Sequence, residues 1–342
     1  MSKKVIVTGG CGYIGSHTII EMIEKTSFTP ICIDNNINSS PKAIDRIEKV
    51  TGKRVKHYSI DLCDTESTEA VFKENSDAVA VIHFAALKAV GESVEKPLEY
   101  YTNNLNSLSN ILRFTHQYGI QNLIFSSSCS LYGNVKQLPV SEQTPLNTPE
   151  SPYANTKKIG EEIIKDYVKV SDVKAVSLRY FNPVGAHESG LIGEDPINKP
   201  NNLVPVVTAV ASGKMEKLTV FGDDYDTRDG SCIRDYIHVT DIARAHISAV
   251  NYLLEDKQSS NYDVLNLGTG NGITVIELIK AFEKVAKLDL NYELGARREG
   301  DVVAVFSDNT KVSKCLNWNP EYGIEKMMET AWKWQLNLNK GE

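Results

Sequence analysis

The fold is decided near the N-terminus by the stretch Thr8-Gly9-Gly10-Cys11-Gly12-Tyr13-Ile14-Gly15-Ser16. It follows an apolar run, Val5-Ile6-Val7, that is typical of a buried strand, and it leads into residues 16–24, which have the pattern of a helix. Three of its glycines are spaced three apart: Gly9, Gly12 and Gly15. Such a turn needs positive φ, and a bound pyrophosphate needs main-chain amides that no Cβ atom obstructs. Because the glycines lie between a strand and a helix, they predict a dinucleotide-binding loop.

Short apolar runs and amphipathic segments alternate through the rest of the first half. Buried strands are predicted at residues 31–33, 79–82, 123–125 and 173–178, and a long helix at residues 105–118. This alternation implies a parallel sheet with helices on both faces. The predicted fold class is therefore α/β, a Rossmann-type doubly wound parallel sheet with a smaller α/β C-terminal substrate domain.

The pattern changes after Tyr180. Residues 182–229 are rich in Pro, Gly, Asn and Asp, which predicts loops and short elements that face a substrate. Periodicity returns at residues 236–254, predicting a helix, and residues 262–267 predict a strand. We expect both to rejoin the first domain. The predicted dinucleotide-binding domain is thus residues 1–181 plus 235–266, and the substrate domain is residues 182–234 plus 267–342.

Composition limits the classes of partner. The net charge is −7 over 342 residues, with acids spread along the chain, so neither nucleic acid nor an anionic membrane is expected as a partner. No leader peptide or membrane span is predicted. The cysteines are scattered without a CxxC pair, which indicates neither a metal cluster nor a disulfide framework and favours a reducing, cytoplasmic location. They are Cys11, Cys32, Cys63, Cys129, Cys232 and Cys315.

Two carboxylates are placed to contact a dinucleotide. Asp34 follows the second strand, 19 residues beyond Gly15, where a carboxylate accepts hydrogen bonds from the adenosine ribose and repels a 2′-phosphate. This predicts NAD rather than NADP as the cofactor. A purely structural alternative is that Asp34 opens the turn at Asn35-Asn36. Asp61, after the third strand, is a candidate for the adenine edge or an ordinary turn residue.

The segment Ser151-Pro152-Tyr153-Ala154-Asn155-Thr156-Lys157 reads as a helix start, with Ser151 as N-cap and proline in the first turn. Tyr153 and Lys157 then lie one turn apart on one face. Lowering the pKa of a tyrosine from ~10 to ~7 takes ~4 kcal/mol. One cation at ~5 Å contributes about 3 kcal/mol at an effective dielectric near 20. Lys157 and the positive nicotinamide of NAD together predict that Tyr153 serves as a base, with Ser128 bonding the substrate hydroxyl and the phenolate.

Longer strings then become recognisable. The chain resembles the extended short-chain dehydrogenase/reductase family in eight segments. They are the glycine loop, HFAALKAVGES (83–93), KPLEYYTNN (96–104), SSSCSLYG (126–133), SPYANTK (151–157), RYFNPVGAH (179–187), RDYIHV (234–239) and RREGD (297–301). Within this family they are most similar to the enzymes that epimerise UDP-hexoses at C4. The resemblance runs from Lys4 to about Trp334. The long strings are far more specific than the glycine loop.

The resemblance implies a set of ligand contacts, position by position. Those with NAD, besides the glycines, would be Tyr13, Ile14, Asp34, Asn35, Asn38, Ser39, Asp61, Leu62, Phe84, Ala85, Lys88, Asn103, Tyr153, Lys157 and Phe181. Those with a UDP-sugar would be Asn182, Asn202, Leu203, Phe221, Arg234, Arg298 and Asp301. The two arginines suit a diphosphate, and the aspartate suits ribose hydroxyls.

The implied activity is the interconversion of UDP-glucose and UDP-galactose, a step of galactose metabolism, in a homodimer with tightly bound NAD. Tyr153 would take the proton of the sugar 4-hydroxyl while NAD takes the C4 hydride, and the 4-ketose would rotate and be reduced on its opposite face. Catalysis would rest on Tyr153, Lys157 and Ser128, without a metal.

Two positions depart from the family pattern. Ala86 replaces a glycine, a small change that we expect to be tolerated. Val305 stands where relatives carry tyrosine or a smaller side chain, and in the family that side chain limits the room beside the sugar's 2-substituent. Because valine is shorter than tyrosine, we expect some activity on UDP-GlcNAc and UDP-GalNAc.

Two rival functions remain open from the sequence. Sugar-nucleotide dehydratases and decarboxylases share the fold but place an acid beside the active-site serine or threonine, because elimination needs one there. Here Cys129 and Ser130 follow Ser128, which disfavours them. A non-catalytic, NAD-sensing protein would not need Ser128, Tyr153 and Lys157 together.

Overall fold

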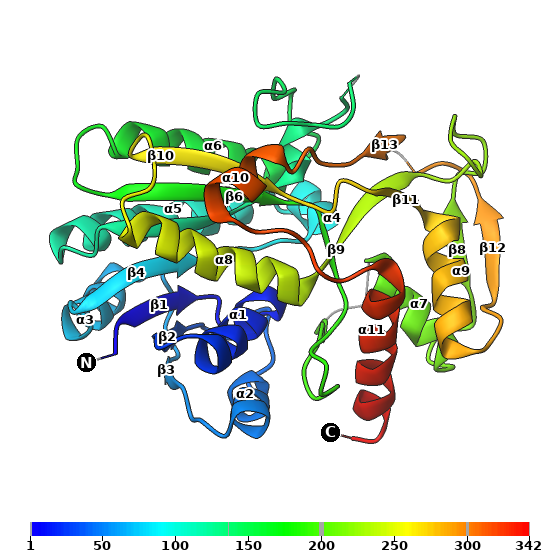
Figure 1. Cartoon of the computed structure of the whole chain (residues 1–342), viewed down its shortest axis with the longest axis horizontal. Helices are drawn as coiled ribbons and strands as arrows, with labels where there is room; N and C mark the ends of the chain where they lie inside the picture. Colours follow the sequence, from blue (N-terminus) through cyan, green and yellow to red (C-terminus); the bar gives the residue numbers. More distant parts are fainter. Residues whose placement is uncertain (1, 136, 198–201, 299–300, 342) are drawn as a thin grey trace.

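The computed structural model describes residues 2–135, 137–197, 202–298 and 301–341. Its main feature is a seven-stranded, wholly parallel sheet in the order β10-β6-β5-β4-β1-β2-β3 (Figure 1). The strands are β1 (Lys4–Thr8), β2 (Thr29–Ile33), β3 (Lys56–Tyr58), β4 (Ala78–His83), β5 (Asn122–Ser128), β6 (Lys174–Tyr180) and β10 (Tyr262–Leu267). Because all run in one direction, their carboxyl ends meet at a single edge of the sheet.

Helices cover both faces of this sheet. One face carries α1 (Tyr13–Lys25), α2 (Ala43–Thr51), α8 (Val239–Leu254) and α10 (Thr310–Leu316). The other carries α3 (Thr65–Glu74), α5 (Pro97–Gln117) and α6 (Pro152–Tyr167). Two short elements follow β4 and β5, namely α4 (Val90–Glu95) and the 3₁₀ turn η1 (Cys129–Tyr132).

The second half of the chain forms smaller sheets beside the first. β9 (Ile233–His238) pairs in parallel with β7 (Asn182–Val184) and β13 (Ala304–Val305) and antiparallel with β11 (Gly272–Thr274). β8 (Leu218–Phe221) pairs with β12 (Tyr292–Gly295). The helices here are α7 (Leu203–Ala211), α9 (Val275–Ala286) and α11 (Ile324–Asn339). These three helices share an apolar core of their own.

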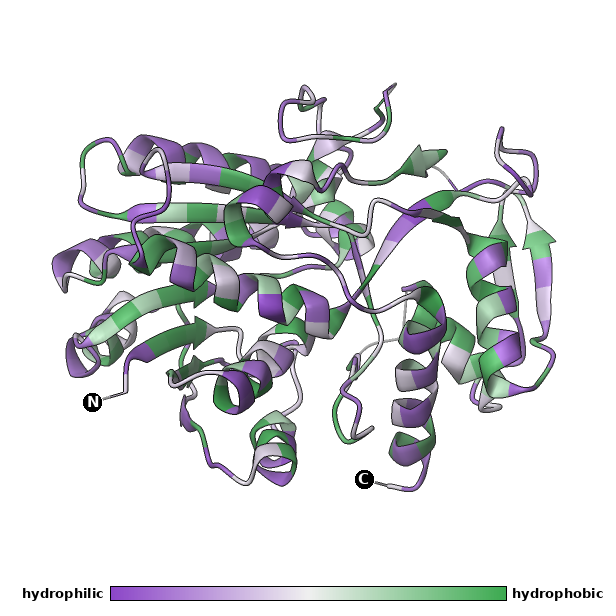
Figure 2. Ribbon diagram, viewed as in Figure 1, coloured by the Kyte–Doolittle hydropathy of each residue, from purple (hydrophilic) through white to green (hydrophobic). Residues whose placement is uncertain are grey.

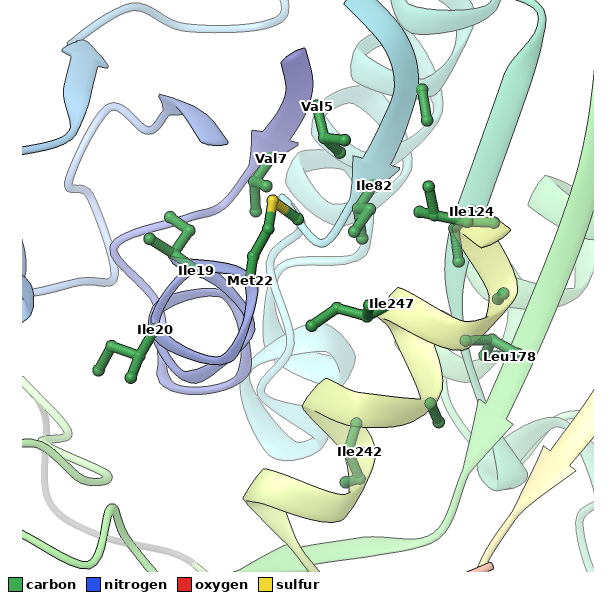
Figure 3. Close-up of a cluster of buried hydrophobic side chains, with 14 of the residues drawn as sticks. Val5, Val7, Ile19, Ile20, Met22, Ile82, Ile124, Leu178, Ile242 and Ile247 are labelled. Atoms are coloured by element: carbon green, nitrogen blue, oxygen red, sulfur yellow. The ribbon is translucent and has the colours of Figure 1, made fainter. Parts of the chain in front are cut away.

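The cores lie on the two faces of the large sheet. Figure 2 shows β1 and β4 mainly green, whereas the helices carry both colours, as expected for strands buried on both faces and helices buried on one. Figure 3 shows Val7 and Ile82 of the sheet meeting Met22 of α1 and Ile247 of α8. The large sheet is therefore packed between two layers of helices.

The predicted fold class is confirmed, and every predicted strand is present with small changes in length. One prediction was wrong. The helix expected at residues 236–254 begins only at Val239, because Tyr236 and Ile237 pair with β7 as part of β9. His238 ends that strand and caps the helix by accepting a hydrogen bond from the Thr240 amide at 3.1 Å.

A buried ion pair fixes α6 to the sheet. Arg179 of β6 and Glu161 of α6 are 5% and 6% exposed. Arg179 Nε donates to Glu161 Oε1 at 2.9 Å and Nη2 to Oε2 at 2.5 Å, and the Ser127 hydroxyl donates to Oε1 at 2.6 Å. None of the described helices is both long and apolar enough to cross a membrane.

Replacing Glu161 by alanine leaves the Arg179 guanidinium buried without its counter-ion. We expect Glu161→Ala to lower the free energy of unfolding by about 3–5 kcal/mol, measured by urea denaturation. The control is Glu162→Ala, which removes an exposed carboxylate from the same helix. Equal stability of the two variants would contradict the assignment.

Candidate active site

The predicted cofactor residues gather at the carboxyl edge of the large sheet. The glycine loop follows β1, Asp34 follows β2, Phe84 follows β4 and Phe181 follows β6. Ser128 is the last residue of β5. Parallel strands thus bring together segments that are far apart in the sequence.

The glycine loop has no room for side chains at two of its positions. Gly9 has φ of +68°, and a Cβ there would lie 2.7 Å from the Ala85 amide nitrogen. A Cβ at Gly15 would overlap the Gly9 carbonyl oxygen. Gly12 is the N-cap of α1, so the first amides of that helix point toward the loop. The arrangement fits a pyrophosphate at the helix N-terminus.

Asp34 is 9% exposed, and the protein already supplies three of its hydrogen-bond donors. The Cys11 amide donates to Oδ2, and the Asn36 amide and the Ser39 hydroxyl donate to Oδ1, each at 2.9 Å. Asp34 therefore does open the turn at Asn35-Asn36. A carboxylate offers about four acceptor positions, so it retains capacity for a ribose hydroxyl.

The other predicted cofactor residues differ in accessibility. Leu62 is buried in the apolar core, and Phe84 lies against His246 with their ring centroids 4.5 Å apart. Lys88 is exposed and pairs with Glu194 at 3.5 Å. Asn35, Asn38 and Asp61 are exposed, and Tyr13, Ile14, Ala85 and Asn103 are partly so. The Tyr13 hydroxyl donates to the Gly185 carbonyl at 2.5 Å, joining the loop to the second half.

Helix α6 brings the predicted proton-transfer residues to the end of β5. As predicted, Ser151 caps the helix by accepting a hydrogen bond from the Ala154 amide at 3.2 Å. Lys157 is buried, and its Nζ donates to the Ser126 carbonyl at 2.7 Å. The same Nζ lies 5.9 Å from the centroid of the Tyr153 ring. Tyr153 and Ser128 are both partly exposed.

The electrostatics of this group differ from those expected. Burial raises the pKa of Tyr153, and hydrogen bonding with Ser128 lowers it only in part. Burial also lowers the pKa of Lys157 to about 7, against the opposing charge of Glu161. The chain alone therefore keeps Tyr153 protonated. A second positive charge, such as an oxidised nicotinamide, must supply the rest of the stabilisation that a phenolate needs.

The residues beside Ser128 offer no acid or base for elimination. Burial raises the pKa of the Cys129 thiol to about 12, so it stays protonated at neutral pH. Ser130 carries a hydroxyl rather than a carboxyl group, and that hydroxyl donates to Ser128 Oγ at 2.9 Å. This arrangement disfavours the dehydratase alternative.

A second cluster gathers the residues predicted to bind a UDP-sugar. Asp301 Oδ1 accepts from Arg298 Nη2 at 3.1 Å and from Arg234 Nη2 at 3.4 Å. Arg298 lies over the Phe221 ring, 5.8 Å from its centroid. Two guanidinium groups beside one carboxylate leave net positive charge, which suits a diphosphate.

Val305 joins this cluster to the first one. It pairs with Arg234 across β13 and β9, and it is buried with Phe181 and with Leu131 of η1. Asn182 is the first residue of β7. Asn202 occupies the N-cap position of α7, but its side chain makes no capping hydrogen bond and instead donates to Glu194 Oε1 at 2.9 Å. Leu203 is the first residue of α7. In the RREGD string, Glu299 and Gly300 lie outside the described residues.

Two residues that the sequence reasoning missed hold these segments in place. Asn104 of α5 exchanges hydrogen bonds with the Leu87 main chain at 2.8 and 3.1 Å and donates to Thr156 of α6 at 3.0 Å. Asp235 is fully buried and accepts from Thr269 and Ser307 main-chain amides at 2.7 and 3.0 Å. Their positions inside the strings KPLEYYTNN and RDYIHV were the available signal.

Comparison with known proteins identifies the family of the chain. A family model described as GDP-mannose 4,6 dehydratase matches residues 6–331. The UDP-glucose 4-epimerase of Bacillus subtilis is 46% identical over 337 residues, covering 98% of each protein. This chain belongs to the UDP-glucose 4-epimerase family. The resemblance seen in the sequence strings is thereby confirmed.

Solved structures of UDP-glucose 4-epimerases superpose along nearly the whole chain. The enzyme of Bifidobacterium longum, in complex with NAD⁺ and UDP, has a TM-score of 0.93 at 45% identity and covers 99% of this chain and 100% of its own. The UDP-Glc/GlcNAc 4-epimerase of Campylobacter jejuni has a TM-score of 0.83 at 37% identity, covering 98% and 99%.

Proposed function

We infer that this chain interconverts UDP-glucose and UDP-galactose by transient oxidation at C4 of the sugar, with NAD as its cofactor. The expected family, enzyme class and cofactor agree with relatives named UDP-glucose 4-epimerase and with neighbours that contain NAD. The observation that carries the inference is spatial. Ser128 ends β5 at the same edge of the large sheet as the glycine loop, and Lys157 donates to the neighbouring Ser126 carbonyl. Val305 is the register partner of Arg234 and belongs to the same buried apolar cluster as Phe181, which follows β6.

The residues present fit NAD, because the tight turn that Gly9 and Gly15 permit leads directly into the N-terminus of α1, where a pyrophosphate binds, and Asp34 retains an acceptor position. When bound, NAD supplies reversible hydride transfer. Tyr153 accepts the proton of the 4-hydroxyl as a phenolate and returns it to the 4-keto oxygen. Ser128 hydrogen-bonds that oxygen, and Lys157 stabilises the phenolate.

Anchoring the nucleotide explains inversion at C4. Arg234 and Arg298 hold the diphosphate, and Asp301 orients both guanidinium groups. The hexose then makes the weaker contacts, so its 4-keto form turns about the bonds to the diphosphate and presents either face. If the sugar were bound as tightly as the diphosphate, the 4-keto sugar could not rotate.

The size of the residue at position 305 supports a wider substrate range. Val305 is 7% exposed and belongs to the buried apolar cluster that contains Phe181 and Leu131, and its side chain is shorter than that of a tyrosine. We propose some activity on UDP-GlcNAc and UDP-GalNAc, as the name of the Campylobacter jejuni neighbour also suggests.

Three further expectations remain proposals. The domain division, residues 1–181 plus 235–266 for NAD and the rest for the UDP-sugar, is supported by β10 joining the large sheet, although β9 spans the boundary at residue 235. A homodimer is supported by exposed apolar side chains at Val90, Val94 and Leu98. Six free thiols suit the cytoplasm.

The central test replaces the tyrosine. Tyr153→Phe should fold and retain NAD but lose turnover of UDP-galactose by a factor on the order of 10²–10⁴, since only the proton acceptor is removed. Turnover is measured on purified protein without added NAD, and Tyr167→Phe on the same helix is the control. Near-normal turnover of Tyr153→Phe would remove this residue from the mechanism.

The lysine should appear in the pH dependence. A cation about 6 Å away stabilises a phenolate by about 3 kcal/mol at an effective dielectric near 20, or about 2 pH units. Lys157→Met therefore raises the pKa of Tyr153, so the acidic limb of kcat moves to higher pH by that amount. The control is Lys158→Met, which removes a partly exposed lysine from the same helix. An unshifted limb with reduced kcat would assign Lys157 a structural role only.

Val305→Tyr tests the substrate range. The unmodified protein should convert UDP-GlcNAc, and Val305→Tyr should lower the ratio of UDP-GlcNAc to UDP-glucose turnover by at least about tenfold, since excluding the acetamido group costs more than ~1.4 kcal/mol. Val303→Tyr, at an exposed neighbouring position, is the control. An unchanged ratio would show that residue 305 does not bound the sugar site.

A further inference from the structure

Three side chains that the mechanism does not use meet behind the glycine loop. Cys32 of β2 and His57 of β3 are register partners on adjacent parallel strands, so their side chains project from the same face of the sheet. The Cys11 side chain, from the glycine loop, contacts both of them. Gly10 makes this approach possible, because a Cβ there would lie 2.7 Å from Cys32 Sγ. Sequence spacing had given no sign of a cluster, since the three residues come from separate elements.

The atoms of this cluster have the spacing of metal ligands. Cys11 Sγ lies 3.8 Å from Cys32 Sγ and 3.8 Å from His57 Nε2, and the three atoms lie within 4.8 Å of one another. A tetrahedral zinc ion with Zn–S of about 2.3 Å and Zn–N of about 2.0–2.1 Å separates two sulfurs by about 3.8 Å and sulfur from nitrogen by about 3.6 Å. Two of the three edges therefore match with small shifts.

The separation of the two sulfur atoms also shows that Cys11 and Cys32 are free thiols. A disulfide would require the two sulfur atoms to move from 3.8 Å to about 2.05 Å apart. A bound cation would use them near their present distance. We propose that Cys11, Cys32 and His57 form a binding site for one Zn²⁺ ion, with the fourth position taken by water.

The chemistry of the three groups supports zinc rather than a hard cation. Two sulfur ligands and one imidazole are a set that zinc accepts, whereas Mg²⁺ and Ca²⁺ require oxygen. On binding, each thiol releases its proton to solvent and His57 ligates through neutral Nε2. His57 is partly exposed, which gives the ion a path, while Cys11 and Cys32 are buried.

The site is linked to the cofactor residue Asp34 by two hydrogen bonds. The Cys11 amide donates to Asp34 Oδ2 at 2.9 Å, and His57 Nε2 lies 3.1 Å from the Asp34 carbonyl oxygen. Ligation of Nε2 would release that carbonyl. The zinc site thus adjoins the ribose-binding carboxylate without sharing a side chain with the catalytic residues, so its test is independent of the proposed activity.

The experiment measures metal binding by the reduced, NAD-loaded full chain. A phosphine reductant keeps the thiols free, Zn²⁺ is titrated against a chromophoric chelator, and Co²⁺ serves as a spectroscopic probe. We expect one Zn²⁺ per chain and a Co²⁺ complex with tetrahedral d–d bands and thiolate charge-transfer absorption. Cys11→Ala and His57→Asn should each weaken Zn²⁺ binding by at least about 100-fold.

Controls make every outcome decisive. Cys315→Ala removes a thiol on α10, away from the cluster, and should leave the Zn²⁺ affinity and the Co²⁺ spectrum unchanged. Should either ligand variant fold poorly, the Co²⁺ spectrum of the unmodified protein still decides. A Co²⁺ complex without thiolate charge transfer, or Zn²⁺ affinity that survives loss of Cys11 or His57, would overturn the proposal.

Discussion

Helix α6 is held against the large sheet by contacts that recur once per turn along a single face. Two turns in from Tyr153, Glu161 is locked to Arg179 and Ser127, and between them Lys157 donates to the Ser126 carbonyl. Because residues four apart lie nearly above one another on a helix, the ion pair sets the rotation of α6 about its axis. The position of the Tyr153 phenol at the end of β5 follows from that rotation.

The same burial that positions these residues also controls their charge. A lysine in a low-dielectric site holds its proton less firmly, and a tyrosine there holds its proton more firmly. Ionisation of the Tyr153 phenol then depends on a further positive charge from outside the chain, such as that of an oxidised nicotinamide.

The sequence was sufficient to predict those features that depend on residue type and on the local pattern of apolar residues. The glycine loop, the Ser151 cap and the strand at residues 262–267 follow from residue type and periodicity. It was insufficient where tertiary pairing decides. The residues around Tyr236 do not indicate whether it lies in a strand or in a helix. The proximity of Cys11 to His57 depends on which strands are neighbours in the sheet. The sign of the Tyr153 pKa shift likewise required burial to be seen.

The chain enters the large sheet a final time at β10, which pairs with β6 only after the 81 residues between Tyr180 and Tyr262 have been traversed. During synthesis the edge of β6 therefore stays unpaired while β7, β8 and β9 are being made. An N-terminal fragment that ends before β10 therefore lacks one edge strand of the large sheet. Cooperative completion of both halves, rather than stepwise addition, is the kinetic consequence of this topology, and closure of so long a loop predicts slow folding.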